Sequence, residues 1–227
     1  AVLLVGIGQG LVLLVPVGGG GMLAGCAAWC RTHHPETRII GLEPAGASSM
    51  SEALEVGEPV TLRGIDTFVD GAAVSRAGAV TFPLIQQAGV EMISVPEGQI
   101  CSEMLDLYQT DGIIAEPAGA LASAVLPTHS MDERLALTPG STIVAIVSGG
   151  NNDVSRYAEI VERALIHEGR KHYFLVQFPQ EPGALRRFLD DVLGPEDDIT
   201  HFEYVKRSNR ETGPALVGIE LGDPYEY

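Results

Sequence analysis

Four consecutive glycines, Gly18 to Gly21, are the residues whose type and spacing most directly suggest a binding site. They follow an apolar run that starts at Leu11 and is typical of a strand buried on both faces, and a helical pattern begins at Met22. Glycines at such a turn let backbone N–H groups approach an anion at the positive end of the helix dipole. The pattern predicts a phosphate site. The alternative is a flexible turn without a ligand, although four glycines cost more conformational entropy than a turn requires.

The residues after the glycines restrict the kind of phosphate. A P-loop places Lys and Ser or Thr directly after its last glycine, and a dinucleotide fingerprint reads G-x-G-x-x-G. Here Met22 and Leu23 follow, so no side chain is available for a triphosphate or its Mg²⁺. The sequence therefore favours a small phosphate held mainly by backbone, as in a phosphorylated cofactor.

A second group with possible chemistry consists of cysteines and histidines that follow the glycines: Cys26, Cys30, His33 and His34. They could form a metal cluster, but their helical spacing favours a small buried face that ends at a polar cap. We therefore predict no metal site. The chain has three cysteines in all, which predicts no disulfide framework and a reducing compartment.

Composition excludes several classes of protein. The chain of 227 residues has a formal charge of −16, which argues against a nucleic-acid surface and against an anionic membrane as partner. The first residues do not form a charged region with a cleavage site, and Gly6 to Gly10 interrupt the apolar opening. We expect a cytoplasmic protein without a signal peptide or membrane span.

Strand and helix patterns alternate along the first part of the chain, which predicts an α/β fold with a mostly parallel sheet and helices on both faces. Expected strands cover residues 38–43, 91–95, 113–116 and 141–147, and expected helices cover 48–56, 97–110, 117–121 and 153–167. The last strand runs into Ser148-Gly-Gly-Asn-Asn152. Both glycine-rich turns thus follow strands, at the carboxyl ends where such sheets bind ligands.

The pattern changes after Gly169. A strand at 171–178, a helix at 182–193 and two alternating strands at 199–206 and 215–221 predict a small α+β unit with antiparallel pairing. We therefore expect a first domain over residues 1–168 and a second over 169–227.

Five motifs in order, PVGGGGMLAG, GLEPAGA, DGAAV, GIIAEPAGAL and VSGGNND, resemble those of fold-type II pyridoxal-phosphate enzymes, specifically the biosynthetic threonine dehydratases (threonine ammonia-lyases). The segment HYFLVQFPQEPGALRRFLDDVLG resembles their ACT-like regulatory domain. Together these segments extend the resemblance over nearly the whole chain.

The resemblance implies roles for individual residues. The main-chain N–H groups of Gly18, Gly19, Gly20, Gly21 and Met22 would hold the phosphate of pyridoxal 5'-phosphate. Ser148 would pair with the pyridine nitrogen, and its hydroxyl would leave that nitrogen largely unprotonated. The alternative for Ser148 is a helix cap or a turn hydroxyl.

Further positions match less specifically. Glu116 and the backbone of Gly71 to Ala73 would line the pocket, although Glu116 could equally cap the helix beside it. Glu43 and the carbonyl of Ala47 match positions where some relatives bind a cation. Ser49 stands where those relatives have a carboxylate, so we predict no metal.

The Schiff-base lysine of the family is not found in a matching context, because the chain has only Lys171 and Lys206, both in its last part. The family's asparagine for the ring hydroxyl has no match either. Two strand-like runs also abut at Gly6 to Gly10 without room for a crossover helix, and the chain stops abruptly after a strand-like run. We expect that segments near both ends are absent from this sequence.

By resemblance, the expected function is conversion of L-threonine, or L-serine, to a 2-oxo acid and ammonia. For threonine the product is 2-oxobutanoate, in the first step of isoleucine biosynthesis. We expect a homo-oligomer, dimer or tetramer, regulated by isoleucine or valine. The N–H groups of the turn 178–183 would bind the effector's carboxylate, and Glu196, Asp197 and Asp198 would bind its ammonium or simply be solvated. The alternative function is a non-catalytic module that senses branched-chain amino acids or forms oligomers.

Overall fold

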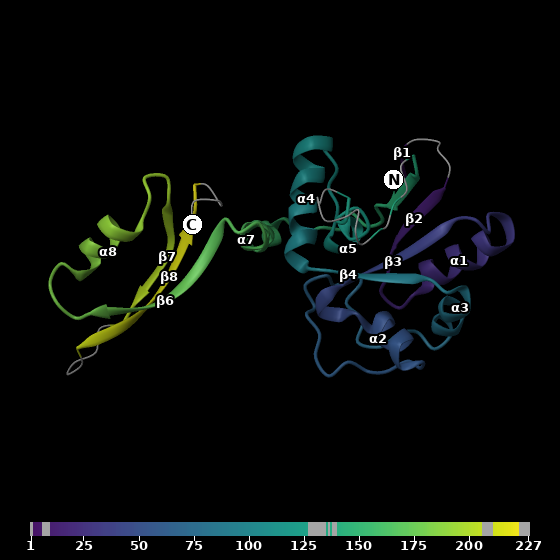
Figure 1. Ribbon diagram of the computed structural model, residues 1–227, viewed down its shortest axis with the longest axis horizontal. Helices are drawn as coiled ribbons and strands as arrows, with labels where there is room; N and C mark the ends of the chain where they lie inside the picture. Colours follow the sequence, from purple (N-terminus) through teal and green to yellow (C-terminus); the bar gives the residue numbers. More distant parts are fainter. Residues whose placement is uncertain are drawn as a thin grey trace. The chain divides into compact units, whose positions relative to one another are not determined.

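The computed structural model describes residues 10–126, 135, 137, 140–205 and 211–222, and the backbone of residues 2–5 (Figure 1). Cα packing divides the chain into two compact units, Ala1–Ile160 and Val161–Tyr227. The division falls within one helix, and the domain boundary expected at 168/169 stays a prediction. No helix among the described residues is both long enough and apolar enough to cross a membrane.

The first unit contains a five-stranded sheet in the order β1-β5-β2-β3-β4. All neighbours are parallel except β1 and β5, which pair antiparallel. The mostly parallel sheet is therefore confirmed. The strands are β1 (Val2–Val5), β2 (Leu11–Pro16), β3 (Arg38–Pro44), β4 (Glu91–Val95) and β5 (Thr142–Ile146).

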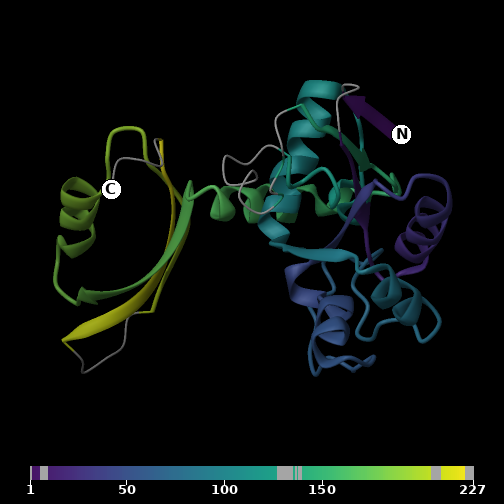
Figure 2. The same cartoon turned by 45° about the vertical axis from the view of Figure 1, so that its right-hand side comes forward.

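Helices cover both faces of this sheet. In Figures 1 and 2, α1, α2 and α3 lie on one side and α4 and α5 on the other. The first side packs Leu23, Met50 and Ile85 against Val15 in one apolar cluster. Among the described residues, the helices are α1 (Gly21–His33), η1 (Ala45–Ala47), α2 (Ser49–Val56), α3 (Thr81–Ala88), α4 (Glu97–Asp111), α5 (Pro117–Ala120), η2 (Val154–Arg156) and α7 (Tyr157–His167), which crosses the division between the two units.

Two details differ from the sequence-based expectation. Residues 113–116 do not join the sheet as a strand, because the N–H of Glu116 donates to the carbonyl of Gly149 (3.0 Å) in a turn. The sequence patterns also did not predict α3.

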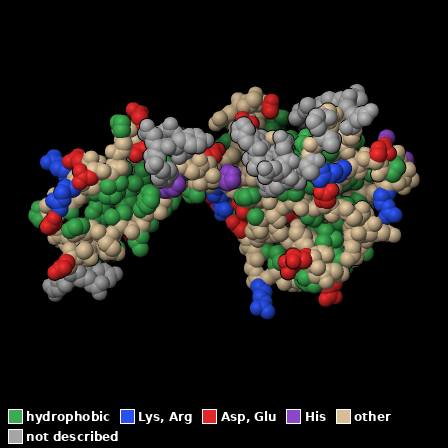
Figure 3. Space-filling view, in the orientation of Figure 1, with side chains coloured by type: hydrophobic (Ala, Val, Ile, Leu, Met, Phe, Trp, Pro, Cys, Tyr) green, Lys and Arg blue, Asp and Glu red, His purple; other side chains and the backbone are tan. Residues whose placement is uncertain are grey.

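The second unit is a three-stranded antiparallel sheet in the order β6-β8-β7, as expected. Its core packs Phe178, Val217 and Ile219 against Phe188 of the helix α8. Figure 3 shows hydrophobic side chains gathered on this unit. Its elements are β6 (Lys171–Pro179), α8 (Ala184–Val192), β7 (Asp198–Tyr204) and β8 (Thr212–Glu220).

Candidate cofactor site

The glycine loop and the Ser148 turn lie at the same edge of the first sheet. β2 and β5 are parallel neighbours, with Leu14 opposite Ala145. Continuing that register places Ser148 level with Val17, immediately before the four glycines. The carboxyl ends of adjacent parallel strands thus bring the two predicted turns together, where α/β folds bind ligands.

Position 20 of this loop strongly favours glycine. Its φ of +85° lies in the left-handed region, and an added Cβ would lie 2.5 Å from Cε of Met50. A residue outside the loop also holds it in place, because the hydroxyl of Thr81 in α3 donates to the carbonyl of Gly19 (2.5 Å). The backbone of the loop is therefore set by its packing against α2 and α3 rather than being a free turn.

The other side of the loop is open. A Cβ at Gly19 or at Gly21 would meet nothing within 4 Å. α1 begins at Gly21 without a side-chain cap and without an acidic residue in its first turn. The exposed start of α1 therefore has N–H groups without an intrahelical acceptor and a positive local potential, which suits a phosphate.

The turn at residues 69–73 supports the glycine loop from behind. A Cβ at Gly18 would lie 3.2 Å from both Cα and the carbonyl oxygen of Ala72. The N–H groups of Ala72 and Ala73 both donate to the carbonyl of Val69, at 2.8 and 2.7 Å. The Gly71 to Ala73 backbone is therefore close to the loop.

Glu116 lies over the Ser148 turn. A Cβ at Gly149 would be 1.7 Å from Oε1 of Glu116, and one at Gly71 would be 3.5 Å from it. Glu116 occupies the N-cap position of α5, but its side chain makes no capping hydrogen bond. The carboxylate thus lies between the 69–73 turn and the Ser148 turn.

Ser148 is exposed, and its N–H donates to the carbonyl of Gly119 (3.4 Å). The following helical segment is capped by Asp153, whose carboxylate accepts from the N–H of Ser155 (2.9 Å) and whose pKa is lowered by that hydrogen bond. Asp153 therefore caps this segment, and the other alternative for Ser148, a turn hydroxyl, stays open. No hydrogen bond of the Ser148 hydroxyl is found within the described residues, and its role toward a ligand stays a prediction.

Three residues at this edge were missed by the sequence analysis. Thr81 fixes the glycine loop, as described above. Asn152 donates from Nδ2 to the carbonyl of Ala115 (3.2 Å), and its Oδ1 is buried without a hydrogen-bond partner among the described residues. Arg156 donates to the carbonyl of Phe68 (2.7 Å). No sequence motif marks Thr81 or Arg156, because their partners are distant in the chain.

Glu43 accepts hydrogen bonds from the start of α2. Its fully buried carboxylate accepts from the N–H of Met50 (2.7 Å) and from both the N–H (2.9 Å) and the hydroxyl (2.7 Å) of Ser51. Burial raises its pKa, and these hydrogen bonds oppose the rise. The hydroxyl of Ser49 is buried without a partner in the described part of the chain. Among the described residues, no three His, Cys, Asp or Glu side chains are grouped to hold a metal ion.

No lysine among the described residues lies at this edge of the sheet. Lys171 lies in the second unit, 8% exposed and ion-paired with Glu162. Burial alone would lower its pKa, but the hydrogen bond and charge of Glu162 raise it, so the ammonium is favoured. Lys206 lies outside the described residues.

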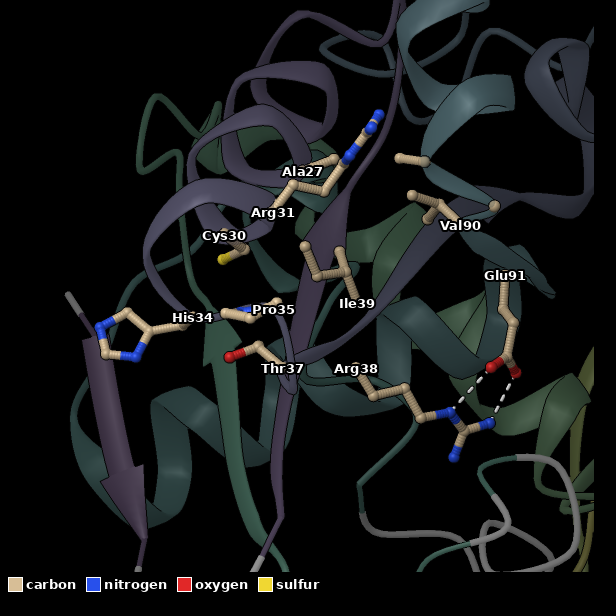
Figure 4. Close-up of a pocket in the computed structure, with 12 residues that line it drawn as sticks. Ala27, Cys30, Arg31, His34, Pro35, Thr37, Arg38, Ile39, Val90 and Glu91 are labelled. Atoms are coloured by element: carbon tan, nitrogen blue, oxygen red, sulfur yellow. Dashed lines mark hydrogen bonds and ion pairs between the residues drawn. The ribbon is translucent and has the colours of Figure 1, made fainter.

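A cavity of about 170 Å³ lies at the opposite edge, where β3 and β4 begin (Figure 4). Arg38 pairs there with Glu91 through two hydrogen bonds of 2.8 and 2.6 Å. This pair raises the pKa of Arg38 and lowers that of Glu91.

The two features expected to hold an effector border different cavities of the second unit. The turn at 178–183 borders a cavity of about 430 Å³ beside the start of α8, which has no side-chain cap. Asp197 borders another, of about 560 Å³, and its carboxylate accepts from the N–H groups of Gly194 (2.9 Å) and Gly222 (3.3 Å). Neither of these two cavities therefore offers both features to one small amino acid.

Comparison with known proteins decides the family. The model of the family "Pyridoxal-phosphate dependent enzyme" matches residues 10–149. The chain belongs to this family. Residues 162–227 match the family described as the C-terminal regulatory domain of threonine dehydratase.

Named relatives agree with this assignment. The chain is 61% identical over 213 residues to L-threonine dehydratase biosynthetic IlvA of Mycobacterium tuberculosis, covering 93% of this chain and 48% of that protein. It is 50% identical over 215 residues to the protein of that name from Lactococcus lactis, covering 95% and 50%. The chain thus spans about half the length of the curated relatives it matches.

Solved structures give the same fold. The processed form of threonine deaminase isoform 2 from Solanum lycopersicum matches with a TM-score of 0.61 and 37% identity, over 69% of this chain and 44% of that one. The serine racemase of maize matches with a TM-score of 0.57 and 26% identity, over 69% and 47%. A fold-type II architecture is therefore confirmed.

The site fits the cofactor that gives the family its name. Pyridoxal phosphate carries one small phosphate group, and the open faces of Gly19 and Gly21 at the uncapped start of α1 leave room for it. The exposed hydroxyl of Ser148 on the neighbouring strand end is available to a ring held beside that phosphate.

Proposed function

We propose that the protein carrying this chain is a pyridoxal-phosphate-dependent threonine ammonia-lyase. It converts L-threonine to 2-oxobutanoate and ammonia in the first step of isoleucine biosynthesis, in the cytoplasm and as a homo-oligomer. The observation that carries the proposal is the pairing, on adjacent parallel strands, of an open, uncapped glycine loop with the exposed hydroxyl of Ser148.

The cofactor's contribution is an electron-withdrawing ring, which stabilises the charge left when the α-proton of the substrate is removed. In this chain, N–H groups from Gly18 to Met22 hold the phosphate and fix the position of the ring. Ser148 would hydrogen-bond the ring nitrogen without giving it a full charge. A hydroxyl partner would leave the ring a weaker electron sink than a carboxylate partner would.

Glu116 forms the wall between the two turns, and the backbone of Gly71 to Ala73 closes the pocket behind the phosphate loop. We assign the Schiff-base lysine to a part of the protein outside the printed sequence, because neither Lys171 nor Lys206 has a sequence context that matches the family's motif, and Lys171 is ion-paired with Glu162 in the second unit.

Binding to this chain is best tested with pyridoxine 5'-phosphate, which lacks the aldehyde and therefore does not depend on the missing lysine. Titration followed by the ligand's fluorescence should show saturable binding that inorganic phosphate displaces. Pyridoxine without phosphate should bind at least tenfold more weakly, a difference of about 1.4 kcal/mol or more. Equal affinity for both would contradict the phosphate assignment.

The reaction itself is tested on the protein that carries this chain, loaded with pyridoxal phosphate. It should show the visible absorbance of bound cofactor and release 2-oxobutanoate from threonine faster than pyruvate from serine. Binding of isoleucine without cofactor absorbance or turnover would instead support the alternative of a non-catalytic sensing module.

We also propose that the second unit, with the cavity beside the start of α8, binds isoleucine or valine as feedback effector. The support is the uncapped helix start after Gly183, whose φ is +86°, together with the apolar walls formed by Phe178, Leu185 and Phe202. The N–H groups of the first turn of α8, at the positive end of the helix dipole, suit a carboxylate, and the walls suit a branched side chain.

A further inference from the structure

Arg156 links two segments of the first unit that are far apart in the sequence. From the turn of helix η2, its Nη2 donates to the carbonyl of Phe68 at 2.7 Å. Its Nη1 lies 3.6 Å from Oδ2 of Asp70, and its guanidinium lies 4.8 Å from the centre of the Phe68 ring. One side chain thus holds the start of the 69–73 turn by a hydrogen bond, an ion pair and ring stacking.

The 69–73 turn that Arg156 holds is packed at its start and lies next to the phosphate loop. Phe68 is only 4% exposed, and Oδ1 of Asp70 accepts from the N–H of Gly71 (2.9 Å). Beyond it, the backbone of Ala72 backs Gly18 of the phosphate loop, and Gly71 lies against Glu116. A displacement of this turn would therefore also displace the phosphate loop and Glu116, which forms the wall of the pocket.

Arg156 is fixed from its own side as well. Its N–H donates to the carbonyl of Asp153 (3.0 Å), so it belongs to the capped segment that follows the Ser148 turn. The guanidinium therefore connects the Ser148 segment to the turn that supports the phosphate loop. The planar, multi-donor head is suited to this task, since a lysine ammonium cannot stack and donate in the same fork geometry.

The geometry points to Arg156 as a positioning residue that sets the distance between the Ser148 hydroxyl and the phosphate loop, and hence the fit of the pyridine ring between them. This inference rests on the proposed function. It adds that the ring's two anchors are coupled by a side chain that does not touch the cofactor.

The test compares Arg156→Ala with Arg38→Ala. Arg38 is a matched control, because its side chain is similarly exposed (29% against 25%) and paired with a carboxylate, but at the opposite edge of the sheet (Figure 4). Both variants should lose stability, whereas only Arg156→Ala should weaken the binding of pyridoxine 5'-phosphate. We expect a loss of about tenfold, as for displacements remote from the chemistry.

Two further measurements distinguish a positioning role of Arg156 from a general loss of stability. Guanidinium ion at millimolar concentration should restore part of the affinity of Arg156→Ala, and Arg156→Lys should recover less than half of the loss. In the cofactor-loaded protein, Arg156→Ala should also shift the absorbance maximum, a signature that Arg38→Ala should leave unchanged.

The outcomes are distinguishable. Unchanged affinity and absorbance in Arg156→Ala, with normal binding by the wild type, would overturn the positioning role and leave the proposed function intact. Equal losses in Arg156→Ala and Arg38→Ala would also overturn it, since both would then act through stability alone. Absence of binding by the wild type would instead contradict the proposed function.

Discussion

Gly19 and Gly20 have opposite structural requirements although they are neighbours. A Cβ at Gly20 would collide with Met50 in a left-handed conformation, whereas one at Gly19 would point into open space. Gly20→Ala should lower the free energy of unfolding by about 2 kcal/mol. Gly19→Ala should change it by less than about 0.5 kcal/mol.

The Gly19→Ala variant should separate binding from stability. Its Cβ would fill the space proposed for the phosphate, so affinity for pyridoxine 5'-phosphate should fall at least tenfold while denaturant unfolding stays normal. A Gly19→Ala protein that binds like the wild type would place the phosphate elsewhere.

Ser148→Ala tests the ring contact. Because the hydroxyl is exposed and has no hydrogen bond within the described structure, its loss should change the melting temperature little. Turnover by the cofactor-loaded protein should fall more than tenfold. Equal proportional losses of stability and activity would favour a structural role for the hydroxyl.

Glu103 should make stability depend on pH. It is 6% exposed on α4, and burial, opposed by a hydrogen bond with Ser123, raises its pKa to about 7, with the charges of Asp106 and Asp111 adding to the rise. In the unfolded chain the group ionises near its ordinary value of 4.5. Between these values the folded state binds more protons at Glu103, so the contribution of this group to stability falls as pH rises from about 4.5 to about 7 and is then constant.

The measurement is denaturant unfolding between pH 5 and pH 8. Glu103→Gln should remove most of this slope and make the protein more stable at pH 8, by about 2 kcal/mol. Glu55→Gln, which changes an exposed carboxylate of α2, is the control and should keep the slope. A wild-type stability that rises through this interval would contradict the assignment.

At the scale of elements, α2 depends on a side chain from the sheet. Glu43 accepts three hydrogen bonds from Met50 and Ser51, which start the helix. In Glu43→Gln, an amide NH₂ would oppose at least one N–H donor, so unfolding free energy should fall by about 2 kcal/mol. Glu52→Gln, an exposed change in the first turn of the same helix, should have little effect on thermal unfolding.

The elements were largely predictable where local pattern decided them. β2, β3, β5 and α4 follow apolar periodicity, and the antiparallel second unit follows alternation. No local pattern indicated α3, which has Pro83 in its first turn and no side-chain cap. Residues 113–116 have an apolar pattern but pair with a turn instead of a strand, which local sequence does not reveal.

The site was predictable at its glycines and at Ser148 because strand ends and motifs mark them. The residues that hold the site in place were not predictable. Thr81 reaches Gly19 across 62 positions, and Arg156 reaches Phe68 across 88. Such contacts depend on the sheet order and become visible only in the folded chain.

At the scale of the whole molecule, regulation requires that effector binding favour one state of the catalytic part. Isoleucine titrated into the protein that carries this chain should release or absorb heat and slow threonine turnover. Gly183→Ala should weaken this response, because Gly183 has a φ of +86° at the turn before α8. Gly169→Ala, similarly strained (φ +70°) but away from that turn, is the control. An isoleucine response that Gly183→Ala leaves intact would remove the effector site from this turn.

One edge of the first sheet is proposed to hold pyridoxal phosphate between the glycine loop and Ser148. The most direct measurement is a crystal structure of this chain grown with pyridoxine 5'-phosphate. We predict the phosphate within hydrogen-bonding distance of N–H groups from Gly18 to Met22, and the ring nitrogen beside the Ser148 hydroxyl. A ligand bound elsewhere, or a glycine loop folded against its own helix in the presence of the ligand, would contradict this assignment.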